Sequence, residues 1–290
     1  MRRIGVHVSI SGGIELSLER AKNLGINTMQ IFSHNPRQWY VKPINKSSIE
    51  LFKRERRNLD ITPLYIHTSY LINIASTNRV VLEKSKKLLL KELDIADSIG
   101  ADYLVLHPGS ASSDEIHRAR KRAVDSLNMV LSKKTWKCTL LLENTAGERG
   151  DISSYIYELF EIIEGVTYRG IGGVCIDTCH AFSAGYNLRS EEGVEGLLRE
   201  IKEYLGVSAV KLLHVNDSKG DVGSHIDRHE HIGKGKIGID GFKLFLRRSE
   251  IANVPLILET PKDNIYDDKV NLDKVRKIVA NWYDGGKDLI

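Results

Sequence analysis

Short runs of apolar and β-branched residues recur along the whole chain, and segments rich in charged residues separate them. The eight apolar runs lie at residues 3–8, 28–33, 63–68, 102–108, 139–144, 171–178, 211–217 and 254–260. Near-continuous apolar runs of this length are typical of parallel strands that are buried on both faces. The pattern therefore predicts eight buried parallel strands.

The segments between these runs have the spacing of amphipathic helices. Gly25 and Gly100 follow two of them, and glycine suits the left-handed conformation at a helix end. The predicted helices lie at residues 16–24, 80–99, 153–163, 191–205, 240–248 and 268–283. Regular alternation of strand and helix in 290 residues favours a closed (β/α)8 TIM barrel of the α/β class over an open doubly wound sheet. No glycine-rich phosphate loop follows the first run and no linker divides the chain, so we expect one domain over residues 1–290.

Six consecutive predicted strands end on a side chain that can bind a metal ion. These residues are His67, His107, Glu143, Asp177, His214 and Glu259. In a β/α barrel the carboxyl ends of the strands meet at one mouth, where active sites lie. A single histidine or carboxylate at a strand end is more often a hydrogen-bonded structural residue. Three carboxylates gathered in one place, however, would repel each other without a cation, so the group predicts a metal site.

Two further segments supply possible ligands to the same mouth. His180 follows Asp177 by three residues, so that one helical turn can direct both side chains inward. Asp227 and His229 are two residues apart and share one side of an extended segment. One metal ion takes roughly four ligands including water, so this set suits three ions. His180, Asp227 and His229 would hold one ion, and the strand-end residues would hold a close pair.

The remaining histidines and the three cysteines have more ordinary expected roles. We expect a solvated helix position for His117, loop positions for His34 and His225, and a surface or outer position for His231. For His7 two alternatives stay open: a hydrogen bond to a metal ligand, or packing in the core. An odd number of cysteines does not indicate a disulfide framework, and Cys175 and Cys179 lack the compact spacing of a zinc-thiolate site.

Composition and net charge exclude few classes of protein. The chain is 41% hydrophobic and 28% charged, which is typical of a globular domain. A net charge of +4 permits a polyanionic partner but does not require one. No apolar stretch approaches the roughly 20 residues that cross a bilayer, and the first apolar run is too short for a signal peptide. We therefore expect a cytoplasmic protein without a membrane segment.

Several longer motifs resemble one known family over essentially the whole chain. They read GVHVSISGG, NPRQW, SYLIN, LHPGS, LLENTAG, GVCIDTCHAFSAGY, HVNDSKGDVGSHIDRHEHIGKGKIG and PLILETP. The chain thereby resembles endonuclease IV, the family-2 apurinic/apyrimidinic endonucleases. This resemblance implies three zinc ions, with manganese as an alternative in one position. It also implies an enzyme that cuts double-stranded DNA on the 5′ side of an abasic site, leaves a 3′-hydroxyl, and removes blocked 3′ ends. We expect a monomer, because the fold needs no partner.

The resemblance assigns a role to each of the possible ligands. Glu143 would bridge the close metal pair and assist deprotonation of the attacking water. His67 and His107 would complete one metal of the pair. Asp177, His214 and Glu259 would complete the other, and His180, Asp227 and His229 would hold the third.

The resemblance also assigns four loop residues to damage recognition. Arg37 and Gln38 in NPRQW, and Tyr70 and Leu71 in SYLIN, would enter the minor groove and flip the abasic nucleotide out. One departure from the family is visible. Relatives often have aspartate directly after the histidine of the third strand, where this chain has Thr68. This difference affects a hydrogen bond near the metal ligands but removes no ligand.

Two other functions remain as alternatives. A sugar isomerase or epimerase on the same barrel would bind one divalent metal through Glu143, Asp177, His214 and Glu259. Such a site leaves the other five possible ligands without a role. A non-catalytic protein that binds damaged DNA is the second alternative, and a nicking assay separates it from a nuclease.

Overall fold

The eight apolar runs form eight parallel strands in a computed structural model that describes residues 2–112 and 114–285. The strands are β1 (Ile4–Val6), β2 (Met29–Phe32), β3 (Leu64–His67), β4 (Tyr103–Leu106), β5 (Thr139–Glu143), β6 (Ile171–Asp177), β7 (Val210–His214) and β10 (Leu256–Leu258). Their spatial order is β1-β10-β7-β6-β5-β4-β3-β2. A parallel bridge between His7 and Gln30 joins the two outermost strands and closes the barrel. The predicted (β/α)8 barrel is confirmed. The expected single domain also covers residues 1, 113 and 286–290, which lie outside the described residues.

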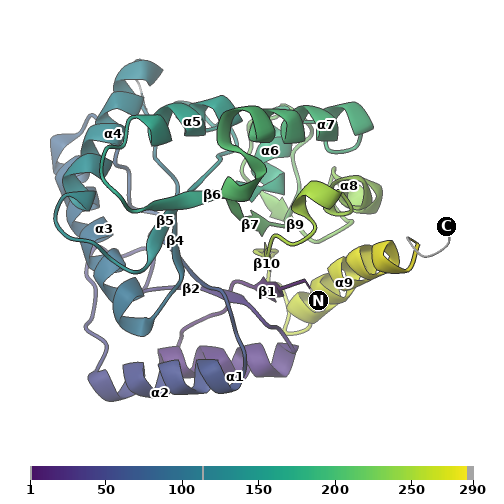
Figure 1. Cartoon of the computed structure of the whole chain (residues 1–290), viewed down its shortest axis with the longest axis horizontal. Helices are drawn as coiled ribbons and strands as arrows, with labels where there is room; N and C mark the ends of the chain where they lie inside the picture. The colour runs from purple at the N-terminus through teal and green to yellow at the C-terminus, as the bar shows by residue number, and fades with distance from the viewer. Residues whose placement is uncertain (1, 113, 286–290) are drawn as a thin grey trace.

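Helices surround the strands, as Figure 1 shows. They are α1 (Ile14–Leu24), α2 (Lys46–Asn58), α3 (Arg79–Ile99), α4 (Ile116–Leu131), α5 (Ile156–Glu164), α6 (Thr178–Ala184), α7 (Glu191–Glu200), α8 (Gly238–Leu246) and α9 (Asp267–Gly285). A π-helical turn (Ile201–Leu205) extends α7, and two 3-10 turns lie at Val207–Ala209 and Ser249–Ile251. Gly25 and Gly100 end α1 and α3 at φ angles of 61° and 74°, as expected for left-handed helix ends.

Two features of the helices differ from the prediction. The predicted helix at 153–163 begins only at Ile156, because the Glu158 carboxylate accepts hydrogen bonds from the Ser154 and Tyr155 backbone N–H groups and caps the helix there. The helix α2 had no predicted position, while α4 was indicated only by the helix position expected for His117 and α6 only by the helical turn from Asp177 to His180. In α2 the only buried residue is Phe52, so its sequence lacks the apolar stripe by which a helix is found.

An apolar layer fills the barrel just below its mouth. Its members are Tyr65, Val105, Leu141, Cys175, Leu212 and Ile257. Each one is fully buried and lies two residues before one of the six predicted strand-end ligands. Because side chains alternate across a strand, residues two apart point to the same face. The apolar layer and the possible ligands therefore occupy successive inward-facing levels of the same strands.

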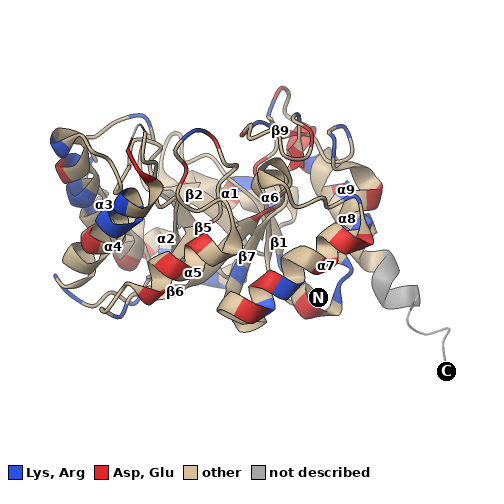
Figure 2. Ribbon diagram, turned by 90° about the horizontal axis from the view of Figure 1, so that it is seen from above, with Lys and Arg blue, Asp and Glu red and all other residues tan. Residues whose placement is uncertain are grey.

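Charged residues lie mainly on the outer helices. Figure 2 shows Lys, Arg, Asp and Glu along these helices, while the strands in the middle are almost free of them. Among the described residues, no helix combines the length and the apolar character that crossing a membrane requires.

Candidate metal centre

The six strand-end residues meet at the carboxyl-terminal mouth of the barrel. His67, Glu143, Asp177 and His214 are the last residues of their strands, while His107 and Glu259 directly follow theirs. We call these six residues, the predicted metal ligands, the ligand ring. Glu143, Asp177 and His214 are fully buried, whereas His107, with a side chain 34% exposed, faces the cavity at the mouth. The ring thus has a buried floor and one open side.

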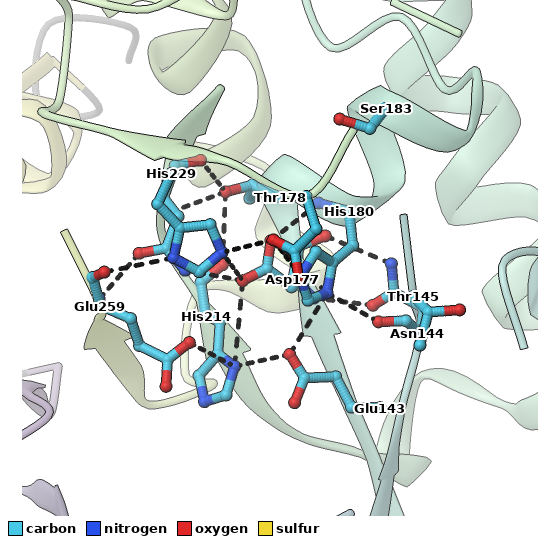
Figure 3. Close-up of polar contacts among 12 residues, drawn as sticks. Glu143, Asn144, Thr145, Asp177, Thr178, His180, Ser183, His214, His229 and Glu259 are labelled. Carbon is cyan, nitrogen blue, oxygen red and sulfur yellow. Dashed lines mark hydrogen bonds and ion pairs between the residues drawn. The ribbon is translucent and has the colours of Figure 1, made fainter. Parts of the chain in front are cut away.

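Glu143 lies at the centre of the ring and contacts ligands from both sides. Its Oε2 atom lies 3.3 Å from His67 Nε2 and 3.1 Å from His107 Nε2. Its Oε1 atom lies 2.8 Å from His214 Nδ1. The two carboxylate oxygens therefore face two different sets of ligands, as Figure 3 shows for His214.

The second set gathers around His214. Its Nδ1 atom lies 3.4 Å from Glu259 Oε2 and 3.9 Å from Asp177 Oδ2. Together with Glu143, these side chains bring one nitrogen and three carboxylate oxygens within 4.8 Å of one another. Nitrogen and oxygen donors in this number suit zinc or manganese.

A third set is built from outside the strands. Asp177 caps α6, and its Oδ1 atom accepts a hydrogen bond of 2.8 Å from the His180 backbone N–H, which fixes the first turn of the helix. His180 Nε2 then lies 3.1 Å from Asp227 Oδ1, and His229 Nε2 lies 3.4 Å from the same oxygen. The Asp227 side chain is 40% exposed, so this set opens towards solvent.

The short hairpin of β8 (Asp217–Ser218) and β9 (His229–Glu230) places Asp227 and His229 at the mouth. The Asp217 carboxylate is buried and accepts hydrogen bonds from five backbone N–H groups, at Ser218, Gly233, Gly235, Ile237 and Gly238. A Cβ atom on Gly235 would lie 2.5 Å from Asp217 Oδ1, so only glycine allows this approach. Asp217 was not among the predicted functional residues.

The ring nitrogens show which atoms are available to a cation. Four of the histidines each place one nitrogen against a backbone carbonyl or side-chain amide oxygen and so carry a proton there. The four contacts are His67 Nδ1 to Thr68 O, 2.8 Å, His180 Nδ1 to Asn144 O, 2.9 Å, His214 Nε2 to Gln30 Oε1, 2.8 Å, and His229 Nδ1 to Glu259 O, 3.2 Å. In the neutral ring the other nitrogen is then a lone pair that faces carboxylate oxygens. Lone pairs opposite carboxylates repel unless a cation lies between them, so these donors fit metal ions.

Two unpartnered atoms support the same interpretation. His180 Nε2 and His229 Nε2 are buried and have no hydrogen-bond partner among the described residues. Buried polar atoms are almost always paired with a partner, so an unpaired one requires an explanation. Both atoms point to Asp227, where a bound cation would satisfy them together.

The charges of the cluster shift the pKa values of its members in opposite directions. Burial lowers the pKa of His67, but the hydrogen bond and charge of Glu143 outweigh it, and the pKa is raised. Burial raises the pKa of Glu143, but His214 and His107 outweigh it, and the pKa is well below its ordinary value. The carboxylates thus attract positive charge into a buried space, and divalent cations would supply it.

Buried amide side chains that sequence reasoning missed hold the carboxylates in place. Gln30 Nε2 donates to Glu259 Oε1 over 2.6 Å, and Asn216 Nδ2 donates to Asp177 Oδ2 over 2.6 Å. Asn144 Oδ1 accepts a bond of 2.7 Å from the Asp177 backbone N–H. All three residues lie within or directly after an apolar run, and a polar residue in that position was the signal that could have revealed them.

The other histidines divide between expected and unexpected positions. His7 lies beside the ligands, with Nδ1 3.5 Å from Glu259 Oε1 and 3.0 Å from Gln30 Nε2, which favours the first of the two alternatives for this residue. His117 is exposed, as expected. His34 lies in a loop as expected but is buried, and His231 is buried against Asn271 rather than lying at the surface.

The four predicted recognition residues lie on two loops at the mouth. Arg37 and Gln38 are exposed on the loop after β2. Tyr70 is 66% exposed on the loop after β3, and its ring meets Phe32 edge-on at 5.3 Å between centroids. Leu71 is half-buried beside it. Arg37 and Tyr70 both line a cavity of about 770 Å³ that shares Tyr70 and Phe32 with the cavity over the ligand ring.

Comparison with known proteins places the chain among nucleases. The family described as xylose isomerase-like TIM barrel matches residues 18–282. A probable endonuclease 4 of Aquifex aeolicus is 42% identical over 283 residues, which cover 97% of this chain and 99% of that protein. One from Methanoculleus marisnigri is 41% identical, with 96% and 99% covered. The chain belongs to the endonuclease IV family. It is therefore a nuclease whose mouth carries groups of side chains that could hold metal ions, and the resemblance seen in its sequence motifs is confirmed.

Solved structures show both the family and the wider fold. Endonuclease IV from Thermus thermophilus superposes with a TM-score of 0.84 at 32% identity and covers 96% of this chain and 99% of that one. A D-tagatose 3-epimerase-like protein superposes with a TM-score of 0.73 at 18% identity, covering 99% and 98%. At that identity the second likeness shows the fold alone. The barrel by itself therefore does not separate the nuclease from an epimerase, and the ligands at the mouth must do so.

Proposed function

We propose that this endonuclease IV family member hydrolyses the phosphodiester on the 5′ side of abasic sites in double-stranded DNA. The cut leaves a 3′-hydroxyl, and the same centre removes blocked 3′ ends. Three zinc ions, with manganese as an alternative in one position, would occupy the mouth. The observation that carries this proposal is the direction of the histidine nitrogens, which face carboxylates in three adjoining sets.

Nine side chains would hold the ions. His67 and His107 with Glu143 form the first site, and His180, Asp227 and His229 form the third. Glu143, Asp177, His214 and Glu259 form the second. When bound, such ions neutralise charge on a phosphodiester and make water a stronger nucleophile.

The chain's own residues perform the remaining tasks. Glu143 is kept ionised by His214 and His107, so it can accept the proton of the attacking water at the centre of the cluster. Asn216 and Gln30 hold the Asp177 and Glu259 carboxylates in fixed orientations, which limits the reorganisation that a reaction needs. A scissile phosphate would enter from the open side, where His107 and Asp227 are exposed.

The recognition loops would select the damaged nucleotide. Arg37, Gln38, Tyr70 and Leu71 would fill the gap left in the duplex when the abasic nucleotide rotates towards the ligand ring. Support comes from the exposure of the Tyr70 side chain, which lies beside the ligand ring and is not packed under its own loop. An exposed aromatic side chain next to a catalytic mouth suits stacking on a base.

The epimerase alternative uses only part of this site. Glu143, Asp177, His214 and Glu259 would suffice for one metal, whereas His180 Nε2 and His229 Nε2 are buried and, among the described residues, unpartnered around a separate carboxylate. A single-metal enzyme gives these atoms no role. The arrangement therefore favours the nuclease with three ions.

Metal content measured together with incision tests the proposal. We expect close to three metal equivalents per chain, mostly zinc, by elemental analysis, and a single cut 5′ to an abasic site placed in a duplex oligonucleotide. One equivalent without incision would support the epimerase. Binding of the abasic duplex without any cut would support the non-catalytic DNA-binding protein.

A further inference from the structure

A glutamate outside the metal centre lies buried between the two recognition loops. Glu92 is 0% exposed on the inner face of α3. Its carboxyl oxygens lie 3.1 and 3.3 Å from the Ser69 backbone nitrogen, whose N–H donates to them. Ser69 directly precedes Tyr70, so Glu92 holds the base of the loop after β3.

The same carboxyl group also contacts the loop after β2. Its Oε1 atom lies 3.3 Å from His34 Nδ1, and the Ser33 hydroxyl donates to it over 3.4 Å. His34 Nε2 donates in turn to the Gln38 carbonyl oxygen over 3.0 Å. This chain of bonds therefore extends from α3 to one of the exposed recognition residues.

A direct bond between the loops completes the network. The Ser69 hydroxyl donates to the Pro36 carbonyl oxygen over 2.7 Å and accepts from the Leu71 backbone N–H over 3.2 Å. The segments that carry Arg37 and Tyr70 are thus joined to each other and to Glu92. No residue of this network belongs to the proposed metal ligands.

The surroundings of Glu92 favour its neutral carboxyl group. His34 Nε2 faces a carbonyl and carries the ring proton, so Nδ1 of the neutral ring is an acceptor, which lies 2.9 Å from the Ser33 hydroxyl and 3.3 Å from the Glu92 oxygen. Burial lowers the pKa of His34 and raises the pKa of Glu92 to about 8. A neutral carboxyl group accepts from Ser69 with one oxygen and donates from the other, and a glutamine amide can do the same.

We propose that Glu92 is a positioning residue that holds the two recognition loops at the separation a flipped abasic nucleotide needs. This inference rests on the proposed function and extends it to a residue that touches neither metal ligand nor DNA. Burial of a leucine at this position would cost less free energy, since Leu88, Leu89 and Leu93 share the inner face of α3 and would pack beside it. Burial of the Glu92 carboxyl group costs free energy. In return the carboxyl group forms hydrogen bonds to both loops, which a leucine could not form.

Substrate selectivity separates this role from a merely structural one. We compare Glu92→Gln and Glu92→Met on a duplex with one abasic site and on bis(4-nitrophenyl) phosphate, a small diester that needs no loops. For Glu92→Met we expect kcat/KM on the duplex to fall about 10- to 100-fold, because a misplaced positioning group costs that much. Turnover of the small diester and zinc content should be unchanged. Glu92→Gln should retain wild-type values on both substrates.

Glu158 provides the matched control. Like Glu92 it is a buried helical glutamate that accepts from the backbone of a loop, here from the Ser154 and Tyr155 N–H groups, and it also pairs with Arg120. That loop carries no proposed recognition residue. Any loss in Glu158→Met should be equal on the two substrates. If Glu92→Met does not fold, Ser69→Ala removes the two bonds of the hydroxyl, to Pro36 and from Leu71, but keeps the backbone bond to Glu92. This variant should show the same selectivity to a smaller degree.

Three results would overturn the inference. They are equal losses on the two substrates in Glu92→Met, no loss on the duplex, or equal damage in Glu92→Gln and Glu92→Met. A wild-type protein that leaves the abasic duplex uncut would instead contradict the proposed function. In that case fluorescence anisotropy with the abasic duplex decides: weaker binding by Glu92→Met supports the positioning role, and equal binding refutes it.

Discussion

The ligand ring and the apolar layer are two levels of the same six strands, yet they differ in what keeps them together. Leu141 and Glu143 lie two residues apart, point into the same barrel and are both fully buried. The apolar layer is stabilised by removal of hydrocarbon from water. The ligand ring gathers three carboxylates, and its own charges oppose it unless cations are bound. The strand geometry points the side chains of both levels into the barrel. The residue types decide that the apolar layer stabilises the fold and that the ligand ring can carry chemistry.

The same contrast explains how a barrel can support a site that is unfavourable by itself. Cys175 and Leu212 lie directly below Asp177 and His214 and have no exposed surface. Burial of a leucine such as Leu212 stabilises the fold by about 1.5–3 kcal/mol. The rigid apolar layer then holds the polar side chains of the ligand ring closer together than they would lie in water.

Removal of the metal ions should have the largest effect of all on this contrast. After treatment with a strong chelator, incision of abasic DNA should fall to background while the far-ultraviolet circular dichroism stays that of a folded α/β protein. The unfolding temperature should fall, since ions bound only to the native state stabilise it. Added zinc should restore incision. Loss of the folded signal on chelation would show that the ligand ring, and not the apolar layer, maintains the barrel.

Glu143→Gln should have the next largest effect. The amide keeps the shape of the side chain but removes the charge and the basicity from the centre of the ring. Incision should fall about 10²-fold or more, as expected for loss of a general base. DNA affinity should survive, because contacts to phosphates dominate it. Turnover close to wild type under single-turnover conditions would contradict the role assigned to Glu143.

Leu141→Ala tests the lower level of the same strand. Truncation of a fully buried leucine should lower the free energy of unfolding by about 2–5 kcal/mol, measured by urea denaturation. Incision per folded molecule and zinc content should stay at wild-type values, because the shortened side chain is not a ligand. A loss of zinc in this variant would mean that the two levels are not separable.

Arg37→Ala and Tyr70→Ala should have the smallest effects. Each should cost about 1–3 kcal/mol on duplex abasic DNA through lost stacking and groove contacts, with little change on bis(4-nitrophenyl) phosphate and none in metal content. Tyr168→Ala is the control, since Tyr168 is 49% exposed but lies just before β6, at the opposite end of the barrel. Equal losses on both substrates would assign Arg37 and Tyr70 to the fold or the metal site.

The fold, and the meeting of six strand-end side chains at one mouth, could be predicted from sequence because both depend on local patterns. An apolar run gives a strand, its last residue gives a position at the mouth, and the barrel topology brings these positions together. His67 and Asp177, for example, could be predicted to lie at the mouth without information about any distant residue. The third set was predictable for a similar reason, since Asp227 and His229 share one side of a short extended segment.

What could not be predicted depends on partners far apart in the chain. Gln30 is bonded to Glu259, 229 residues away, and no local pattern announces that contact. His231 is buried because Asn271, 40 residues away, bonds to its ring. Glu92 is similar: on a helix of charged and apolar residues, a glutamate is expected to face solvent. Such residues acquire their roles only when packing brings the loops together.

Asp217 anchors the hairpin after β7 at its base. Its carboxylate accepts from the backbone of residues 233–238, and the Lys236 N–H donates to the Ser218 carbonyl beside it. The excursion that carries Asp227 and His229 is therefore closed by bonds to the segment that directly follows β7 and not by pairing with the barrel strands. The proposed third set of ligands is thus positioned by a structural unit of its own, separate from the strands that position the other six.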